Sequence, residues 1–142
     1  MYYKDTMLEK LIGKTVTGIL MDEDNLVFET NEGEVCYGVE GDCCSTSYFF
    51  DFYGVKNVIG RKVIDFGEVN LGPGDVGYHK ETYETDDAVY GYRITVEHEL
   101  FGEVSAVFSF RNESNGYYGG WMTEYGHKIT DEQYRLTEDK IG

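Results

Sequence analysis

The chain has 142 residues and a formal net charge of −15, from 27 acidic and 12 basic side chains. That length predicts one domain with a core large enough to fold on its own. The negative charge repels nucleic acid and anionic membranes, so we expect direct contact with neither. An acidic surface also keeps proteins soluble, and this simpler explanation stands beside any functional one.

Tyrosine, phenylalanine and glycine are abundant, with 13 Tyr, 8 Phe and 18 Gly against a single Pro. This mixture is typical of short strands joined by tight turns. We therefore predict a β-rich α+β fold, a single domain spanning 1–142. It is built of antiparallel meanders with about seven or eight strands and one or two short helices.

The N-terminal lead, residues 1–12, is predicted to contain a short helix from Met7 to Ile12 that Gly13 ends. Alternating apolar residues then indicate a meander of three strands. These strands are Thr15–Met21, Leu26–Thr30 and Glu34–Val39.

The next segment, Ser47 to Tyr53, predicts a helix of about two turns closed by Gly54, because a cap-like stretch precedes it. Cys43 and Cys44 lie at its start, after Asp42. We expect the thiols to be buried and structural, with Asp42 accepting hydrogen bonds from first-turn amides. A reactive thiolate is the alternative, which nearby acids disfavour.

A short repeat marks the start of the second half. Val58–Val63 (V-I-G-R-K-V) echoes Leu11–Val16 (L-I-G-K-T-V) 47 positions earlier. We expect each half to enter its sheet by the same turn before a strand, here Lys62–Val69. Residues 71–87, which include Gly72-Pro73-Gly74, predict a long loop, either a functional flap or a disordered insert.

Two strands with strict alternation follow, Tyr90–Glu97 and Glu103–Arg111. If Ile94 lies opposite Phe108, Arg93 and Arg111 become diagonal neighbours that can share one anion. The alternative is that each arginine pairs with a local acid such as Glu97 or Glu113.

The densest stretch of functional residue types is Phe110–Met122 (F-R-N-E-S-N-G-Y-Y-G-G-W-M). Aromatic rings can stack on a base, and a guanidinium can grip a phosphate. A simpler interpretation is an Asn115-Gly116 hairpin turn whose tyrosines cover the end of a sheet. The candidate ligand-binding residues are Arg93, Arg111, Asn112, Asn115, Tyr117, Tyr118 and Trp121.

Residues 117–122 are predicted to form a last strand, and 123–142 a polar C-terminal tail with a short helix starting near Thr130.

No motif indicates catalysis. The cysteines, Cys36, Cys43 and Cys44, are odd in number and lack C-x-x-C spacing, and the chain has neither a G-x-S-x-G elbow nor a phosphate-binding loop. We therefore expect a non-enzyme with no catalytic residues, no cofactor and no metal. A secretory signal and an apolar run of membrane-spanning length are also missing, so we expect free thiols and a cytoplasmic location.

Two stretches together resemble the signatures of an uncharacterised family of small domains common in bacteriophage and prophage genomes. They are Gly41–Ser45 (G-D-C-C-S), followed by an aromatic residue, and Arg111–Trp121, in the pattern R-N-x-S-N-G-Y-Y-G-G-W. The opening Gly13–Gly18 (G-K-T-V-T-G) also matches. Tyr48 stands here where the family pattern has tryptophan.

The resemblance implies an accessory protein made in the cytoplasm of an infected host cell, where such proteins often disarm defences. The first hypothesis is that this chain sequesters a nucleotide-derived immune signal, a small molecule held in a pocket that a homo-oligomer would help to build. The second is an acidic mimic of nucleic acid that inhibits a basic host defence protein such as a CRISPR or restriction nuclease.

Overall fold

The computed structural model describes residues 6–42, 45–71, 88–113 and 119–141. The expectations for Cys43, Cys44, Asn115, Tyr117, Tyr118 and loop residues 72–87 lie outside this part of the chain. In chain order the elements are α1 (Thr6–Glu9), β1 (Val16–Met21), β2 (Asn25–Thr30), β3 (Gly33–Gly41), β4 (Thr46–Tyr53), α2 (Val55–Val58), β5 (Val63–Val69), β6 (Ala88–His98), β7 (Gly102–Glu113), β8 (Gly120–Thr123) and a 3-10 helix (Glu132–Tyr134).

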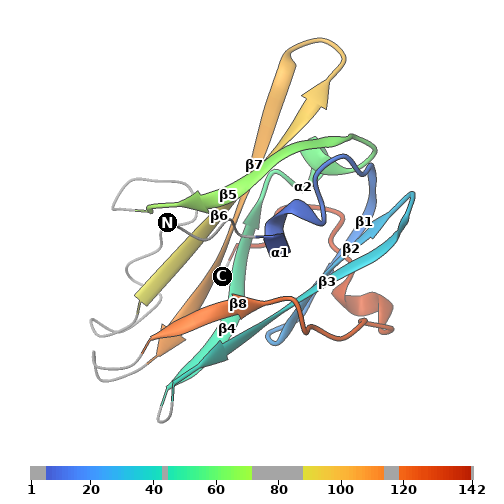
Figure 1. The fold of residues 1–142 in the computed structure, drawn as a ribbon. Helices are drawn as coiled ribbons and strands as arrows, with labels where there is room; N and C mark the ends of the chain where they lie inside the picture. The colour runs from blue at the N-terminus through green and yellow to red at the C-terminus, as the bar shows by residue number, and fades with distance from the viewer. Residues whose placement is uncertain (1–5, 43–44, 72–87, 114–118, 142) are drawn as a thin grey trace.

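The predicted β-rich class is confirmed. The strands form two antiparallel four-stranded sheets, with orders β1-β2-β3-β8 and β4-β7-β6-β5 (Figure 1). Alternating apolar residues turn one face of each sheet inward, as the sequence pattern predicts. The predicted three-strand meander is the first sheet without β8.

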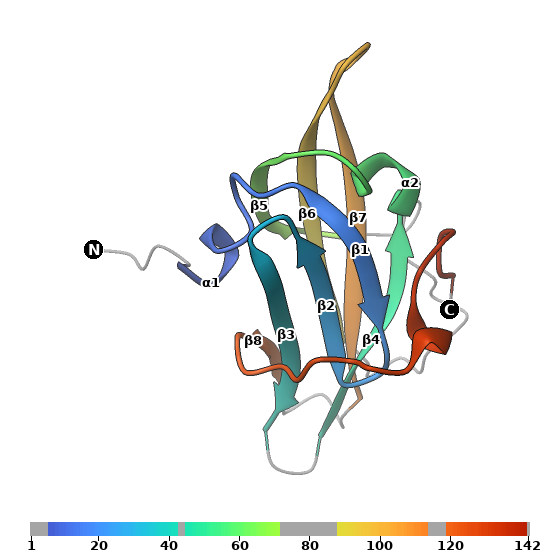
Figure 2. The same ribbon diagram turned by 90° about the vertical axis from the view of Figure 1, so that its right-hand side faces the viewer.

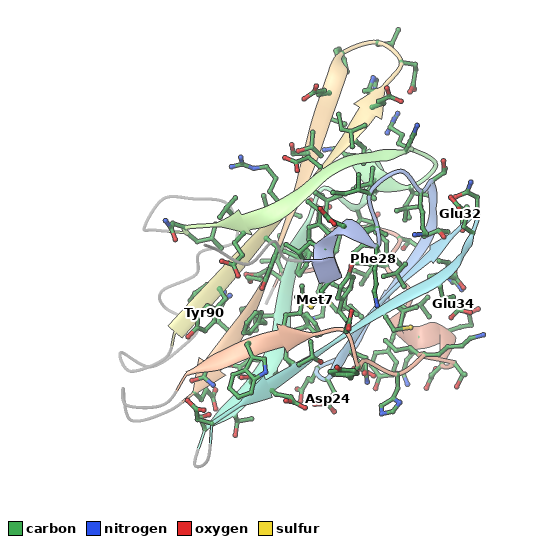
Figure 3. All side chains as sticks on the ribbon, in the orientation of Figure 1. Met7, Asp24, Phe28, Glu32, Glu34 and Tyr90 are labelled. Carbon is green, nitrogen blue, oxygen red and sulfur yellow. The ribbon has the colours of Figure 1, made fainter. Side chains whose placement is uncertain are left out.

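Aromatic rings from both sheets fill the core. Phe28 of β2 lies between the sheets (Figure 3) and its ring centroid is 6.2 Å from that of Phe52 and 6.5 Å from those of Phe66 and Phe108. Phe52 and Phe108 stack at 5.5 Å. These rings are almost completely buried, and edge-to-face and stacked pairs add to the stabilisation from burial alone.

The predicted helix over Ser47–Tyr53 is wrong, because this segment is strand β4. It pairs with β7, with Phe49 opposite Phe110, and its register shifts between Phe49 and Phe52. The irregularity brings both phenylalanines into the core and breaks the two-residue alternation by which a strand is recognised. Gly54, expected to end a helix, instead precedes α2 with φ 87°.

The β6–β7 hairpin has a different register from the one considered above. Ile94 lies opposite Ala106, and Tyr92 opposite Phe108. Alternation of apolar residues cannot distinguish registers that differ by two residues, because both turn the same side chains inward. The turn between the paired residues His98 and Gly102, with Gly102 at φ 82°, selects the observed register.

The two copies of the short repeat pair with each other. Gly13 N–H donates to Val63 O and Gly60 N–H to Val16 O, at 2.8 and 2.7 Å, while Thr15 bridges Lys62. The contacts are therefore reciprocal, because the glycine of each repeat donates to the last valine of the other. The expectation that both halves enter their sheets alike is confirmed at this junction.

The halves also share one element order, a short helix followed by four strands. In each half the first three strands form a meander, and the fourth crosses to the other sheet: β4 joins β7, and β8 joins β3. The strand register shifts at matching positions in the two halves, between Val16 and Gly18 in β1 and between Val63 and Asp65 in β5. The fold is therefore two related halves that have exchanged their last strands.

The C-terminal segment after β8 crosses the outer face of the first sheet (Figure 2). Ile129 packs there on Leu20 and Val27. Leu136 N–H then donates to Ile19 O at 2.8 Å, and Lys140 exchanges two backbone hydrogen bonds with Phe52, both 2.9 Å. This segment, expected to be a polar tail, is thereby tied to both β1 and β4.

Candidate functional site

The two signature stretches meet at one end of the molecule. Asp42 N–H donates to Gly119 O at 2.9 Å, and Gly119 N–H donates to Asp42 Oδ2 at 3.0 Å. The connection from β3 to β4 and the connection from β7 to β8 are thus joined by a reciprocal pair of bonds. We call the described residues here, Glu40–Asp42, Ser45–Ser47, Asn112–Glu113 and Gly119–Trp121, the signature end.

Asn112 holds the centre of the signature end. Its side chain is fully buried, and its Nδ2 donates to Ser45 Oγ at 3.2 Å and to Ser47 Oγ at 3.0 Å. The serine hydroxyls in turn donate to the carbonyl oxygens of Asp42 and Glu40, at 2.7 and 2.9 Å. Asn112 Oδ1 is buried and has no hydrogen-bond partner among the described residues, so one buried acceptor remains for a donor.

Two glycines make room for this network. Gly41 and Gly120 lie directly opposite each other in the β3–β8 pair. A methyl group on either would overlap the Asn112 amide and a serine hydroxyl, Ser45 for Gly41 and Ser47 for Gly120. Close packing between the sheets therefore explains why Gly41 and Gly120 carry no side chain.

Arg111 forms a buried ion pair instead of facing solvent. Its guanidinium is 2.9 Å from Asp51 Oδ2, donates to Ser109 Oγ at 2.6 Å, and lies 4.2 Å from the centre of the Phe50 ring. Arg111 and Asp51 are both completely buried. Burial and the Asp51 carboxylate raise the pKa of the neighbouring Tyr53 phenol. The charge of Arg111 is thus neutralised inside the fold, by an acid other than the two considered from sequence.

Arg93 lies apart from Arg111. It is exposed and pairs with Val107, whereas Arg111 pairs with Val89, four positions further along β7. At about 3.3 Å per strand residue the two positions are too far apart to bind one anion as diagonal neighbours would. The register therefore corrects the expected arginine pair.

Carboxylates and one indole lie at the surface of the signature end. Trp121 is 45% exposed and lies opposite Glu40, which is exposed, in the β3–β8 pair. Glu113 is exposed and accepts a hydrogen bond from Tyr48 Oη at 2.9 Å. Asp42 is also exposed, and its carboxylate accepts from Gly119, not from the first turn of a helix as expected. Such a surface favours cations over phosphates.

Sequence reasoning selected Asn112, Arg111 and Trp121 but missed Asp51, Ser45 and Ser47. The lone acid Asp51 in an apolar run was the available signal for a buried ion pair, since isolated buried charges are rarely left unpaired. The serines gave no local signal because their contacts with Asn112 join positions more than 60 residues apart.

Within the described ranges, no group of three or more His, Cys, Asp and Glu side chains is placed to hold a metal ion. Over the same ranges, no helix is long and apolar enough to cross a membrane. Cys36 is a free, half-buried thiol whose pKa is raised by burial and by Glu34.

Comparison with known proteins gives one family and one curated relative. "Uncharacterized protein L278" of Acanthamoeba polyphaga mimivirus is 28% identical over 102 residues, covering 68% of this chain and 72% of the relative. No solved structure matches the chain. Residues 9–123, which include both signature stretches, match the model of a domain of unknown function, DUF7448. The chain belongs to the DUF7448 family.

Proposed function

We propose that this protein is a non-catalytic inhibitor whose acidic signature end binds arginine and lysine side chains of a basic protein, in the manner of a nucleic-acid mimic. The observation that carries the proposal is the internal pairing of Arg111 with Asp51, which leaves carboxylates and Trp121 at the surface. Carboxylates attract a guanidinium, and an indole face stabilises it further.

The distribution of charge supports the same choice. Lys10, Arg61, Lys128 and Arg135, like Arg111, each lie within 4 Å of a carboxylate of this chain. These five cations are thus paired within the fold of a chain that carries 27 acids against 12 bases. Complementary potentials speed encounter with a basic surface and suppress binding to anionic ligands.

The biological setting rests on the family. A mimivirus protein is among its relatives, and the signatures resemble those of phage and prophage domains. We therefore place the inhibitor in the cytoplasm of an infected cell, with a basic defence protein such as a nuclease as its target.

The test neutralises the signature end without removing its hydrogen bonds. Glu40→Gln, Asp42→Asn and Glu113→Gln together keep acceptors for Gly119 N–H and Tyr48 Oη while removing three negative charges. A control triple, Glu32→Gln, Asp65→Asn and Glu138→Gln, changes three exposed acids elsewhere. Both variants change the net charge from −15 to −12, so they are matched in net charge and differ in where the charge is removed.

The probe is an octa-arginine peptide, followed by basic proteins captured from host lysate at low and high salt. Trp121 is the only tryptophan, so its fluorescence reports binding at the site directly. We expect the signature triple to weaken binding at least about tenfold more than the control, with the wild-type affinity falling steeply as salt rises. Equal losses in both triples would reduce the effect to net charge and contradict the proposed site.

The sequestering of a nucleotide-derived signal, the first hypothesis from the sequence, becomes the second candidate, favoured by the 45% exposure of Trp121, whose ring can stack on a base. Calorimetry with cyclic nucleotides and ADP-ribose derivatives tests it, with Trp121→Ala as the matched variant. Salt-insensitive binding of one of these ligands, lost in Trp121→Ala, would replace the first proposal by this one.

A further inference from the structure

The tip of the β6–β7 hairpin, residues Glu97–Glu103, stands clear of the sandwich, at the opposite end of β7 from the signature end (Figures 1 and 2). Pairing of β5 with β6 ends at Val96, and pairing of β4 with β7 ends at Val107. Glu97 N–H still donates to Lys62 O at 3.0 Å, just before β5 begins, and beyond Glu97 none of the described strands flanks the tip. We call residues Glu97–Glu103 the finger.

Two large apolar side chains lie at the end of the finger. Leu100 is 80% exposed and Phe101 is 74% exposed. They are adjacent, and the rest of the finger is polar or charged apart from Gly102. Adjacent exposed apolar residues bounded by polar ones are typical of a contact that another molecule completes.

The turn is held in one shape before any partner arrives. His98 Nδ1 accepts hydrogen bonds from the amides of Leu100 and Phe101, at 3.0 and 3.2 Å, and the imidazole lies against the Phe101 ring with centroids 4.6 Å apart. Glu103 N–H closes the turn on Phe101 O at 3.0 Å. A rigid apolar tip loses less conformational entropy on binding than a flexible one.

The finger is also fixed to the body of the protein. Both carboxylate oxygens of Glu99 accept from the Arg61 guanidinium, at 3.0 and 3.2 Å, and Arg61 donates in addition to the carbonyls of Lys56 and Asn57. The hydrogen bond to Arg61 lowers the pKa of Glu99 to about 2, so this carboxylate stays charged in neutral solution.

Two acidic side chains lie at the base of the apolar tip, on one face of the hairpin. Glu97 lies directly opposite Glu103 in the hairpin, and both are exposed. Like charges in directly opposed positions are unfavourable within a hairpin, so folding alone does not account for them. This acidic pair opposes contact with an anionic membrane and with the same pair on a second copy. It complements a basic rim.

We propose that the finger inserts Leu100 and Phe101 into an apolar pocket rimmed by lysine and arginine side chains on a partner protein. This inference stands independently of the signature end, because it rests on different residues at the other end of the molecule.

The experiment places the photoreactive residue p-benzoylphenylalanine at Phe101 in the full chain, in the cells that naturally contain the protein. A matched control carries it at Tyr125, an aromatic residue that is 77% exposed outside the finger. A protein crosslinked from position 101 and not from 125 is then purified. Its affinity is measured for the wild type, Leu100→Ser/Phe101→Ser, Glu97→Gln/Glu103→Gln and Tyr125→Ser.

We expect Leu100→Ser/Phe101→Ser to weaken binding at least about thirtyfold and Tyr125→Ser to leave it unchanged, because buried aromatic anchors dominate interfaces. Glu97→Gln/Glu103→Gln should slow association and reduce its salt dependence. Melting temperatures should stay within error of the wild type for the tip variant, since its side chains are exposed. Three outcomes would overturn the proposal. The first is that no adduct is specific to position 101. The second is that position 101 crosslinks only to a second copy or to anionic phosphatidylglycerol vesicles, and the third is that the tip variant binds with unchanged affinity. The charge triples at the signature end serve as the separate test of the proposed function.

Discussion

At the scale of single residues, the Asp51–Arg111 pair shows how burial decides the role of a charge. Desolvating both groups is costly, and removing one partner leaves the other charged and buried. We expect Asp51→Ala to lower the free energy of unfolding by about 3–5 kcal/mol. The double variant Asp51→Leu/Arg111→Met should recover most of that loss. Urea denaturation measures both, and a double variant as unstable as Asp51→Ala would contradict this account.

The same pair marks the limit of prediction from sequence. Arg111 is identifiable as a special residue because it lies among glycines, asparagines and rings. Its partner is 60 positions earlier, in a segment whose irregular register hides its strand character. Local patterns therefore identify the arginine but not the carboxylate that fixes its function.

At the scale of elements, the C-terminal segment completes structure made far away in the chain. Asp139 Oδ1 accepts hydrogen bonds from the amides of Gly54 and Val55, at 2.9 and 3.1 Å, where α2 begins. Gly54 has no side chain to cap this helix itself. We expect Asp139→Ala to lower the free energy of unfolding by about 1 kcal/mol and Asp139→Asn by less, since an amide oxygen can still accept.

Thermal or urea unfolding of the two variants tests this assignment, with Glu138→Ala as the control, because Glu138 is the exposed neighbour of Asp139. Equal stability of Asp139→Ala and Glu138→Ala would show that the cap is not formed in solution. The regular strands were predictable because apolar and polar residues alternate within each of them. The C-terminal segment has no such pattern, and it is held by hydrogen bonds to backbone far away in the sequence, so its polar composition predicted only a tail.

At the scale of the whole molecule, the exchange of last strands explains why two distant signatures meet. The β3–β4 and β7–β8 connections are equivalent in the two halves, and each leads a strand across to the other sheet. They therefore lie together at one end of the sandwich. A six-residue repeat was the sequence signal for this relationship, but alternation within strands does not reveal which sheet a strand joins.

The related halves make a quantitative prediction at their junction. Gly13 and Gly60 occupy equivalent turns, with φ 90° and 83°, and an added methyl group would meet no atom within 4 Å at either position. The cost of alanine at each should then be that of the left-handed backbone alone, about 1–2 kcal/mol. Gly67 in β5 also has open space around an added methyl group, but its φ is not positive. Gly67→Ala should therefore cost little and serves as the control.

Urea denaturation should give equal losses of unfolding free energy for Gly13→Ala and Gly60→Ala, because the same turn is used twice. A substantial loss in one and none in the other would mean that the two turns are not energetically equivalent, despite their matching hydrogen bonds.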